Sequence, residues 1–258
     1  MRLAFSTLGV PGMPPQQVRE LALRTGWTGL ELLSSLDEPL HTGLDTHARA
    51  KFRRELGPEV TPVGVNSYVH VGASHLEDED VITAILSEAE LARDIGAAGV
   101  RVFPGGEPDE SDERLATRLR AAAGQLPAGV QIWLETHDSH STGRQVADVL
   151  ERTASPHVRA IWDLAHTVHG REPWQETVDV LRPHLAHVQI KDEVTAGSTP
   201  VALGCGTLPV AAALTGLLDT GYAGWTSLEW ERKWFPEAEP LEGILTHGRT
   251  WIQDNVLS

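Results

Sequence analysis

Four side chains that carry oxygen each follow a short run of apolar residues. They are Glu135 in I-W-L-E-T, Asp163 in A-I-W-D-L, Gln189 in H-V-Q-I-K and Glu229 in S-L-E-W. Successive members lie 28, 26 and 40 residues apart, close to the length of a strand with its following helix. Four neighbouring parallel strands would bring these oxygens to one place, and such a set suits a hard divalent cation.

Alternation along three of these runs places further polar groups on the same inward faces, because side chains two residues apart on a strand point the same way. The inward triplets are Trp133, Glu135 and His137; His187, Gln189 and Lys191; and Ser227, Glu229 and Glu231. A single glutamate at a strand end is equally well explained by hydrogen bonds to its neighbours. Three acids buried without a counter-charge would be costly, which favours a bound metal.

Eight apolar runs alternate with helical patterns along the whole chain. We expect strands at residues 3–8, 29–33, 63–71, 99–103, 131–135, 158–163, 185–190 and 225–230. We expect helices from Pro14-Pro15 to Gly26 and over 81–95, 112–123, 142–152, 174–181 and 208–218. The segment 104–114, rich in glycine, proline and acid, is interpreted as a solvated loop.

This alternation predicts an α/β protein of the (β/α)8 TIM barrel type. Strands separated by helices imply parallel strands and right-handed crossovers. The 258 residues match the roughly 250 residues of such a barrel, so we expect a single domain over residues 1–258. No Gly-rich dinucleotide or phosphate-binding motif follows the first run, which argues against an open sheet. Active sites of TIM barrels lie at the carboxyl ends of the strands, where the four oxygens fall.

Composition limits the partners of the protein. The 21 Lys and Arg residues against 36 Asp and Glu residues give a net charge of −15, and such a field repels phosphate backbones. Nucleic acid is therefore not an expected partner. The one cysteine, Cys205, cannot form an internal disulfide, and the first residues lack the apolar core of a secretory signal. We expect a cytoplasmic protein without a membrane anchor, since no run approaches roughly 18 apolar residues.

The motifs of the second half resemble those of the xylose-isomerase-like TIM barrel superfamily, in particular its sugar phosphate isomerase/epimerase family. They are W-D-L-A-H, H-V-Q-I-K-D, L-G-C-G-T-L-P and G-Y-A-G-W-T-S-L-E-W-E. The resemblance covers most of the chain and is strongest from about Glu135 to Trp234. It implies that the metal ligands are Glu135, Asp163, Gln189 and Glu229.

Gln189 departs from the pattern of this superfamily, because most members have histidine two positions before the Lys-Asp pair. Some members, including certain 3-dehydroshikimate dehydratases, place a glutamine ligand there. An amide oxygen is a harder ligand than an imidazole nitrogen, so Mg²⁺ or Mn²⁺ is favoured, with Zn²⁺ or Co²⁺ as alternatives. In the alternative interpretation Gln189 only hydrogen-bonds its neighbours, and His187 takes over as ligand.

The resemblance also implies a reaction on a sugar, keto-sugar or polyol derivative. A cation bound to a carbonyl oxygen and the adjacent hydroxyl would stabilise an enediolate, and Glu135 and Glu229 resemble the proton carriers of the family. Two carriers would invert a carbon centre, as in an epimerase, and one would move the carbonyl, as in an isomerase. A dehydratase, in which a β-hydroxyl leaves, and a non-catalytic sugar-binding barrel are the alternatives. The superfamily also includes abasic-site endonucleases, which need more clustered histidines and a basic face. The net charge of −15 and the carboxylate-rich set argue against that function here.

Four residues are candidates to bind a small sugar-like substrate. His166 resembles the histidine of the D-x-x-H motif, and Lys191 and Arg101 could neutralise substrate oxygens. Each also has a structural alternative. His166 could be a helix-capping or loop histidine, Lys191 could pair with Asp163 or Glu229, and Arg101 could form a salt bridge at the barrel floor. His137 shares the face of Glu135. A homodimer is a further expectation, because members of the superfamily often pair barrels through surface helices and loops.

Overall fold

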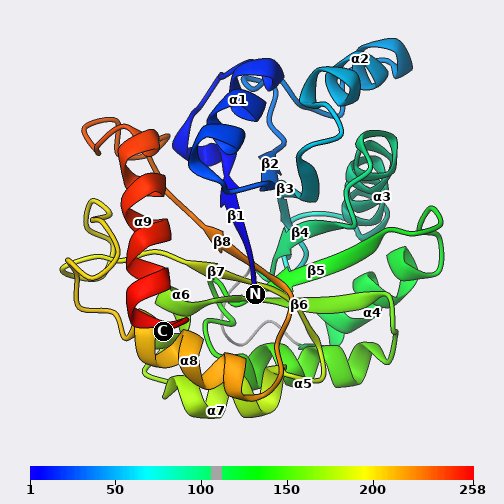
Figure 1. Cartoon of the computed structure of the whole chain (residues 1–258). Helices are drawn as coiled ribbons and strands as arrows, with labels where there is room; N and C mark the ends of the chain where they lie inside the picture. Colours follow the sequence, from blue (N-terminus) through cyan, green and yellow to red (C-terminus); the bar gives the residue numbers. More distant parts are fainter. Residues whose placement is uncertain (106–111) are drawn as a thin grey trace.

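A closed barrel of eight parallel strands forms the centre of the protein, and helices surround it (Figure 1). The computed structural model describes residues 1–105 and 112–258. Within these residues the strands pair in chain order, and the last strand closes the barrel against the first. The predicted (β/α)8 TIM barrel is therefore confirmed.

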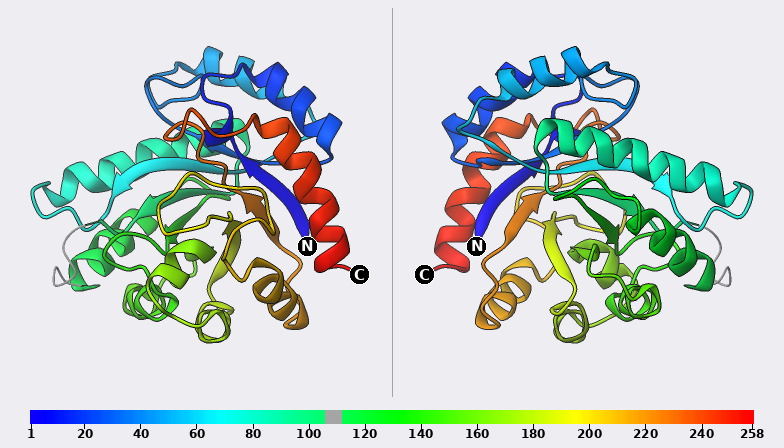
Figure 2. Two further views of the ribbon diagram at one scale, coloured as in Figure 1. Left: turned by 90° about the vertical axis from the view of Figure 1, so that its left-hand side faces the viewer. Right: turned by 90° about the vertical axis from the view of Figure 1, so that its right-hand side faces the viewer.

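The strands and helices alternate along the chain, and the side views show the helices as an outer layer around the strands (Figure 2). The strands are β1 (Arg2–Ser6), β2 (Gly29–Leu33), β3 (Thr61–His70), β4 (Gly99–Phe103), β5 (Gln131–Glu135), β6 (Val158–Asp163), β7 (Leu185–Ile190) and β8 (Trp225–Leu228). The α-helices are α1 (Pro15–Thr25), α2 (Thr46–Leu56), α3 (Asp78–Ile95), α4 (Asp112–Ala123), α5 (Gly143–Thr153), α6 (Leu164–His169), α7 (Trp174–Leu181), α8 (Val210–Asp219) and α9 (Leu241–Asn255).

Strand β1 is shorter than predicted, and its end shows why. Strand β1 stops at Ser6, because the hydroxyl of Ser6 accepts a hydrogen bond from the Leu8 N–H and begins a short 3₁₀ turn. Strand β8 stops at Leu228, so Glu229 lies one residue beyond it. Five strands, β2 and β4 to β7, have the predicted bounds.

The loop predicted over 104–114 extends too far, because helix α4 begins within it. Asp112 to Arg114 form the first turn of α4, because acidic residues such as Asp112 and Glu113 stabilise the amino terminus of a helix. Residues 106–111 lie outside the described residues. Helix α2 has no predicted counterpart, since it buries only Phe52 and Leu56 and its apolar stripe is too narrow to recognise.

The indole ring of Trp133 fills the inside of the barrel below the candidate site. Trp133 lies in a small cluster with Ala4, Val63 and Ile161 that is separate from the core between strands and helices. Glycine on the neighbouring strand β4 makes room for it, because a Cβ at Gly99 would lie 2.2 Å from the indole ring. Trp133 therefore closes the barrel floor, and Glu135, two residues further on, faces the open end.

No helix among the described residues is long and apolar enough to span a lipid bilayer.

A carboxyl group outside the barrel makes stability depend on pH. Burial raises the pKa of Glu88 on α3 to about 7, although a hydrogen bond with Ser34 and the charge of Arg49 oppose this shift. The folded state then binds the proton more tightly than the unfolded state, so the free energy of unfolding falls as the pH rises from about 4.5 to about 7.

We expect Glu88→Gln to stabilise the protein by about 1–2 kcal/mol at pH 8, because an amide does not have to ionise in a half-buried position. Urea unfolding of both proteins at pH 5 and at pH 8 measures this effect. The gap should shrink at pH 5, where Glu88 is mainly protonated in the folded state. An equal gap at both pH values would contradict the role of ionisation.

Candidate metal and substrate site

The four predicted metal ligands lie at the carboxyl end of the barrel. Glu135 and Asp163 end β5 and β6, Gln189 is the penultimate residue of β7, and Glu229 follows β8. Asp163 and Gln189 are direct partners in the sheet. All four side chains are buried, with exposed fractions between 0% and 4%. The structure thus brings the predicted residues to one end of the barrel, on four consecutive strands.

Two buried cations compensate the three acids. Arg101 Nη1 lies 3.4 Å from Glu135 Oε2 and 3.5 Å from Glu229 Oε1. Lys191 Nζ lies 3.4 Å from Asp163 Oδ2 and 3.5 Å from Glu229 Oε2. The sequence argument that the acids lack a counter-charge is therefore wrong. The floor position considered for Arg101 is also wrong, because its guanidinium stacks over Phe103 at 4.2 Å, at the open end of the barrel.

Three of the four predicted ligands nevertheless keep an oxygen without a hydrogen-bond partner among the described residues. These atoms are Glu135 Oε2, Asp163 Oδ2 and Gln189 Oε1, and all are buried. The ion-pair contacts of the two carboxylate oxygens are 3.4 Å or longer, which is longer than a hydrogen bond. Buried polar atoms usually have partners, so these three oxygens fit a hard divalent cation.

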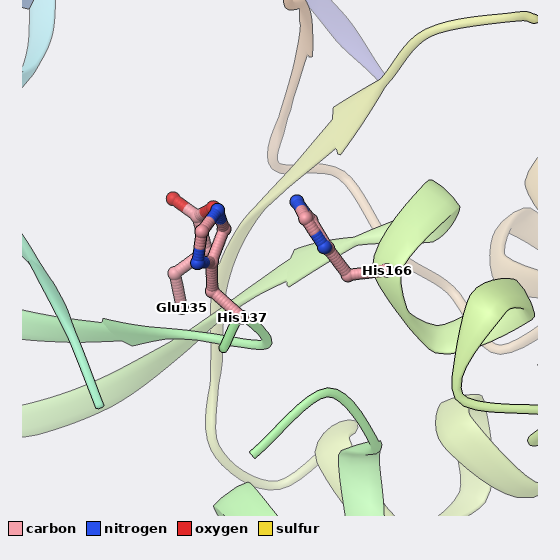
Figure 3. A group of neighbouring side chains, drawn as sticks. All are labelled: Glu135, His137 and His166. Atoms are coloured by element: carbon pink, nitrogen blue, oxygen red, sulfur yellow. The ribbon is translucent and has the colours of Figure 1, made fainter. Parts of the chain in front are cut away.

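A second group of atoms could also hold a metal. Glu135, His137 and His166 each offer one ligand atom, and these atoms lie within 4.8 Å of one another. In Figure 3 the imidazole of His166, from α6, points toward Glu135 and His137. Two nitrogens and one oxygen would suit zinc or cobalt better than magnesium. The site therefore offers two overlapping ligand sets, one with oxygen only and one mixed, that share Glu135.

Burial shifts the pKa values of the acids in different directions. Burial raises the pKa of Glu135 and of Glu229 above the ordinary glutamate value, although Arg101 opposes the shift at Glu135 and Lys191 opposes it at Glu229. Burial opposes ionisation of Asp163 as well, but Lys191 and His166 outweigh it and hold its pKa below the ordinary value. Asp163 is therefore ionised, and the two glutamates are better proton acceptors than free carboxylates.

The two histidines of the site also differ in charge. His137 and His166 face each other with ring centroids 4.1 Å apart. Burial lowers the pKa of His137, but Asp138, whose Oδ1 lies 2.6 Å from His137 Nδ1, outweighs it and leaves the pKa raised. Burial lowers the pKa of His166 to about 3. His137 can thus donate a proton, whereas His166 is neutral. Such a pair of unlike titratable groups is common in acid–base sites.

An open cavity of about 270 Å³ leads to these residues. Arg101, Glu135, His137 and Glu229 line its inner part. Its outer wall is aromatic, because the ring of Tyr68 lies between those of Phe103 and Trp234, with centroid distances of 6.0 Å to Phe103 and 6.1 Å to Trp234. The cavity is large enough for a small molecule, with charged groups at one end and rings at the other.

The predicted substrate-binding residues all lie around this cavity or next to it. Arg101 and His137 line it directly. Lys191 lies just behind, where its Nζ also contacts Glu231 Oε1 at 2.8 Å. His166 Nε2 lies 3.8 Å from Asp163 Oδ2, so the D-x-x-H pair is formed. The alternative of an ion pair for Lys191 is also realised, since its ammonium group already contacts Asp163.

Two buried acids have a role that the sequence patterns do not identify. Glu31 on β2 accepts hydrogen bonds through Oε1 from His187 Nε2 at 2.8 Å and from Gln189 Nε2 at 3.0 Å. Asp192 accepts hydrogen bonds from four backbone N–H groups between residues 193 and 208. The only signal for Glu31 was a charged residue on an otherwise apolar strand. The L-G-C-G-T-L-P segment is the loop that Asp192 fixes.

His187 lies deeper in the barrel than the four ligands. It is fully buried, and its ring meets Trp133 edge-on with centroids 5.0 Å apart. Its Nε2 is engaged by Glu31. The amide nitrogen of Gln189 hydrogen-bonds Glu31, as the alternative interpretation expects, while its oxygen has no partner among the described residues. The role of Gln189 as a metal ligand stays a prediction.

The chain belongs to the xylose isomerase-like TIM barrel family, whose model matches residues 19–255. This confirms the resemblance seen in the motifs. Three solved structures show how closely the fold is shared. The probable 3-DHS dehydratase AsbF of Bacillus anthracis has a TM-score of 0.82 and 17% identity, over 98% of this chain and 99% of that chain.

D-psicose 3-epimerase of Clostridium cellulolyticum H10, solved with D-tagatose, has a TM-score of 0.80 and 13% identity, over 99% of this chain and 98% of that chain. The IOLI protein, solved with a bound zinc atom, has a TM-score of 0.80 and 17% identity, over 99% of this chain and 98% of that chain. At these identities the likeness establishes the fold alone. A search of curated protein sequences gave no match.

Proposed function

We propose that the protein is a divalent-metal-dependent isomerase or epimerase of a sugar, keto-sugar or polyol derivative. The observation that carries this proposal is a group of three buried oxygens, on Glu135, Asp163 and Gln189, at the inner end of an open cavity. None of them has a hydrogen-bond partner in the part of the chain that the structure describes. The epimerase among the structures of similar fold supports the same class of substrate. A bound cation would polarise a carbonyl and stabilise the charge that develops when the neighbouring carbon loses a proton.

Glu135 and Glu229 are the proposed proton carriers. They come from β5 and from the residue after β8, and Arg101 Nη1 contacts one oxygen of each at 3.4 and 3.5 Å. Their carboxyl groups are thus close enough to act on one small molecule from two directions. One carboxylate would take the proton and the other would return it, which inverts a carbon centre. Arg101 and Lys191 would hold the substrate oxygens.

A dehydratase is the second candidate, and His137 favours it. Elimination of a β-hydroxyl needs an acid near the leaving group. His137 borders the cavity and contacts Asp138 through Nδ1, so its Nε2 could donate a proton to a leaving hydroxyl. The similar fold of the probable 3-DHS dehydratase AsbF agrees with this alternative.

One experiment separates these reactions. The protein, supplied with Mn²⁺, is incubated in deuterated water with keto-sugars, cyclic polyols and their oxidised derivatives. We expect deuterium to enter one carbon of a substrate while the product remains an isomer, as seen by NMR and mass spectrometry. Loss of water with a new enone absorbance would replace the isomerase with the dehydratase. Binding of a sugar without any exchange of carbon-bound protons would refute both.

A further inference from the structure

The side-chain amide of Gln189 has a defined orientation. Its Nε2 lies 3.0 Å from Glu31 Oε1 and 3.5 Å from Glu229 Oε1. Both neighbours are carboxyl groups, and an ionised carboxylate can only accept hydrogen bonds. The NH₂ end of the amide must therefore face Glu31. The opposite end, Oε1, is buried and has no hydrogen-bond partner among the described residues.

Glu31 reaches Gln189 across the inside of the barrel. Strand β2 is not a neighbour of β7 in the sheet, since β8 and β1 lie between them. Glu31 is fully buried, and its Oε1 also accepts a hydrogen bond from His187 Nε2 at 2.8 Å. Two donors from one strand thus converge on one oxygen of Glu31. Because Glu31 is fully buried, solvent does not compete with these two donors for the oxygen.

The orientation of the amide matters for metal binding, because its two ends are not equivalent. The carbonyl oxygen of glutamine is a ligand for hard cations, whereas the NH₂ group donates hydrogen bonds and has no lone pair to share. A rotation of the amide by half a turn would present the wrong end. Residues that orient metal ligands in this way commonly change metal affinity about 10- to 100-fold when mutated.

We propose that Glu31 is a positioning residue that holds the Gln189 amide with its oxygen toward the metal position, and so provides the oxygen ligand where histidine is usual in this family. The inference rests on the proposed metal-dependent function. It extends that function by assigning the preference for Mg²⁺ or Mn²⁺ to a contact across the barrel. No step of the reaction is assigned to Glu31 itself.

Two substitutions separate hydrogen bonding from charge. Glu31→Gln keeps an acceptor oxygen at the same distance but removes the charge. Glu31→Asp keeps the charge but withdraws the acceptor by one methylene group. We expect Glu31→Gln to bind Mn²⁺ within about threefold of the wild type, and Glu31→Asp to bind it about 10- to 100-fold more weakly. Calorimetric titration of the metal-free proteins with MnCl₂ measures both affinities.

A double variant shows whether Glu31 acts through Gln189. In a Gln189→Leu background, addition of Glu31→Asp should cause no further loss of Mn²⁺ affinity. Glu38→Asp is the matched control, because Glu38 is also a buried acid. Its carboxylate accepts hydrogen bonds from Lys233 and from the Gly12 N–H and contacts none of the proposed metal ligands. This control should bind Mn²⁺ as the wild type does.

The outcomes distinguish this inference from the proposed function. Wild-type affinity in Glu31→Asp, or an equal loss with and without Gln189, would overturn the role of Glu31 while the metal site stands. A wild-type protein that binds no Mn²⁺ would overturn both. If Glu31→Asp does not fold, hydrogen exchange of the Gln189 side-chain amide in the metal-free wild type decides. Slow exchange, seen by NMR, supports the bond to Glu31, and fast exchange overturns it.

Discussion

Replacing Glu229 by glutamine is expected to lower turnover by about 1,000-fold while the barrel remains folded. Glutamine has the length of glutamate, and its carbonyl oxygen can still serve as a ligand, but it cannot accept a proton. The loss should therefore appear in kcat rather than in metal binding. The label that enters carbon from deuterated water should disappear with the turnover, because both depend on the same proton transfer.

The fold should tolerate this change for an electrostatic reason. Burial and the neighbouring carboxyl groups of Glu135 and Asp163 all raise the pKa of Glu229, so the site is crowded with negative charge. A neutral amide of equal size relieves this repulsion, and Lys191 and Arg101 keep their other acidic partners. Thermal unfolding should therefore show a midpoint at or above that of the wild type.

A matched control separates this effect from a general loss of charge. Glu237→Gln changes an exposed glutamate after the same strand, where the carboxylate accepts a hydrogen bond from Thr199. This variant should turn over substrate as the wild type does. Near-normal turnover in Glu229→Gln, with bound Mn²⁺ and an intact fold, would show that Glu229 carries no proton in the reaction.

The parts of the structure that depend on local sequence could be predicted well. The strand that ends at Glu135 and the strand that ends at Asp163 have the predicted bounds, because a run of apolar residues followed by a polar one marks both burial and the end of the strand. Period-two alternation likewise placed Gln189 on an inward face, where it is fully buried.

The parts that depend on contacts across the barrel could not be predicted. Glu31 and Gln189 are 158 residues apart, and no periodicity relates a residue of one strand to a residue of a non-adjacent strand. Arg101 shows a second limit. Alternation gives the face from which a side chain starts, but a long flexible side chain can carry its charge several ångströms further, here to Glu135 and Glu229.

Removal of divalent metal is expected to abolish activity, and Mn²⁺ or Mg²⁺ is expected to restore it with about one ion bound per chain. The three buried oxygens that have no hydrogen-bond partner within residues 1–105 and 112–258 would then coordinate the metal ion. This binding lowers the free energy of the folded state only. At a free metal concentration 100 times the Kd, the free energy of unfolding should rise by about 2.7 kcal/mol. Chelation followed by metal titration, with turnover and thermal unfolding measured on the same samples, checks all three effects.

The choice of metal tests which ligand set is used. If the oxygen set of Glu135, Asp163, Gln189 and Glu229 binds the catalytic ion, then Gln189→Leu should weaken Mn²⁺ binding while leaving the bound protein folded. If the mixed set with His137 and His166 binds it, Zn²⁺ should restore more activity than Mn²⁺, because imidazole nitrogen favours zinc. A chelated protein that keeps full activity would refute both sets. Arg101 and Lys191, which contact these acids, would then supply positive charge to stabilise a substrate oxygen.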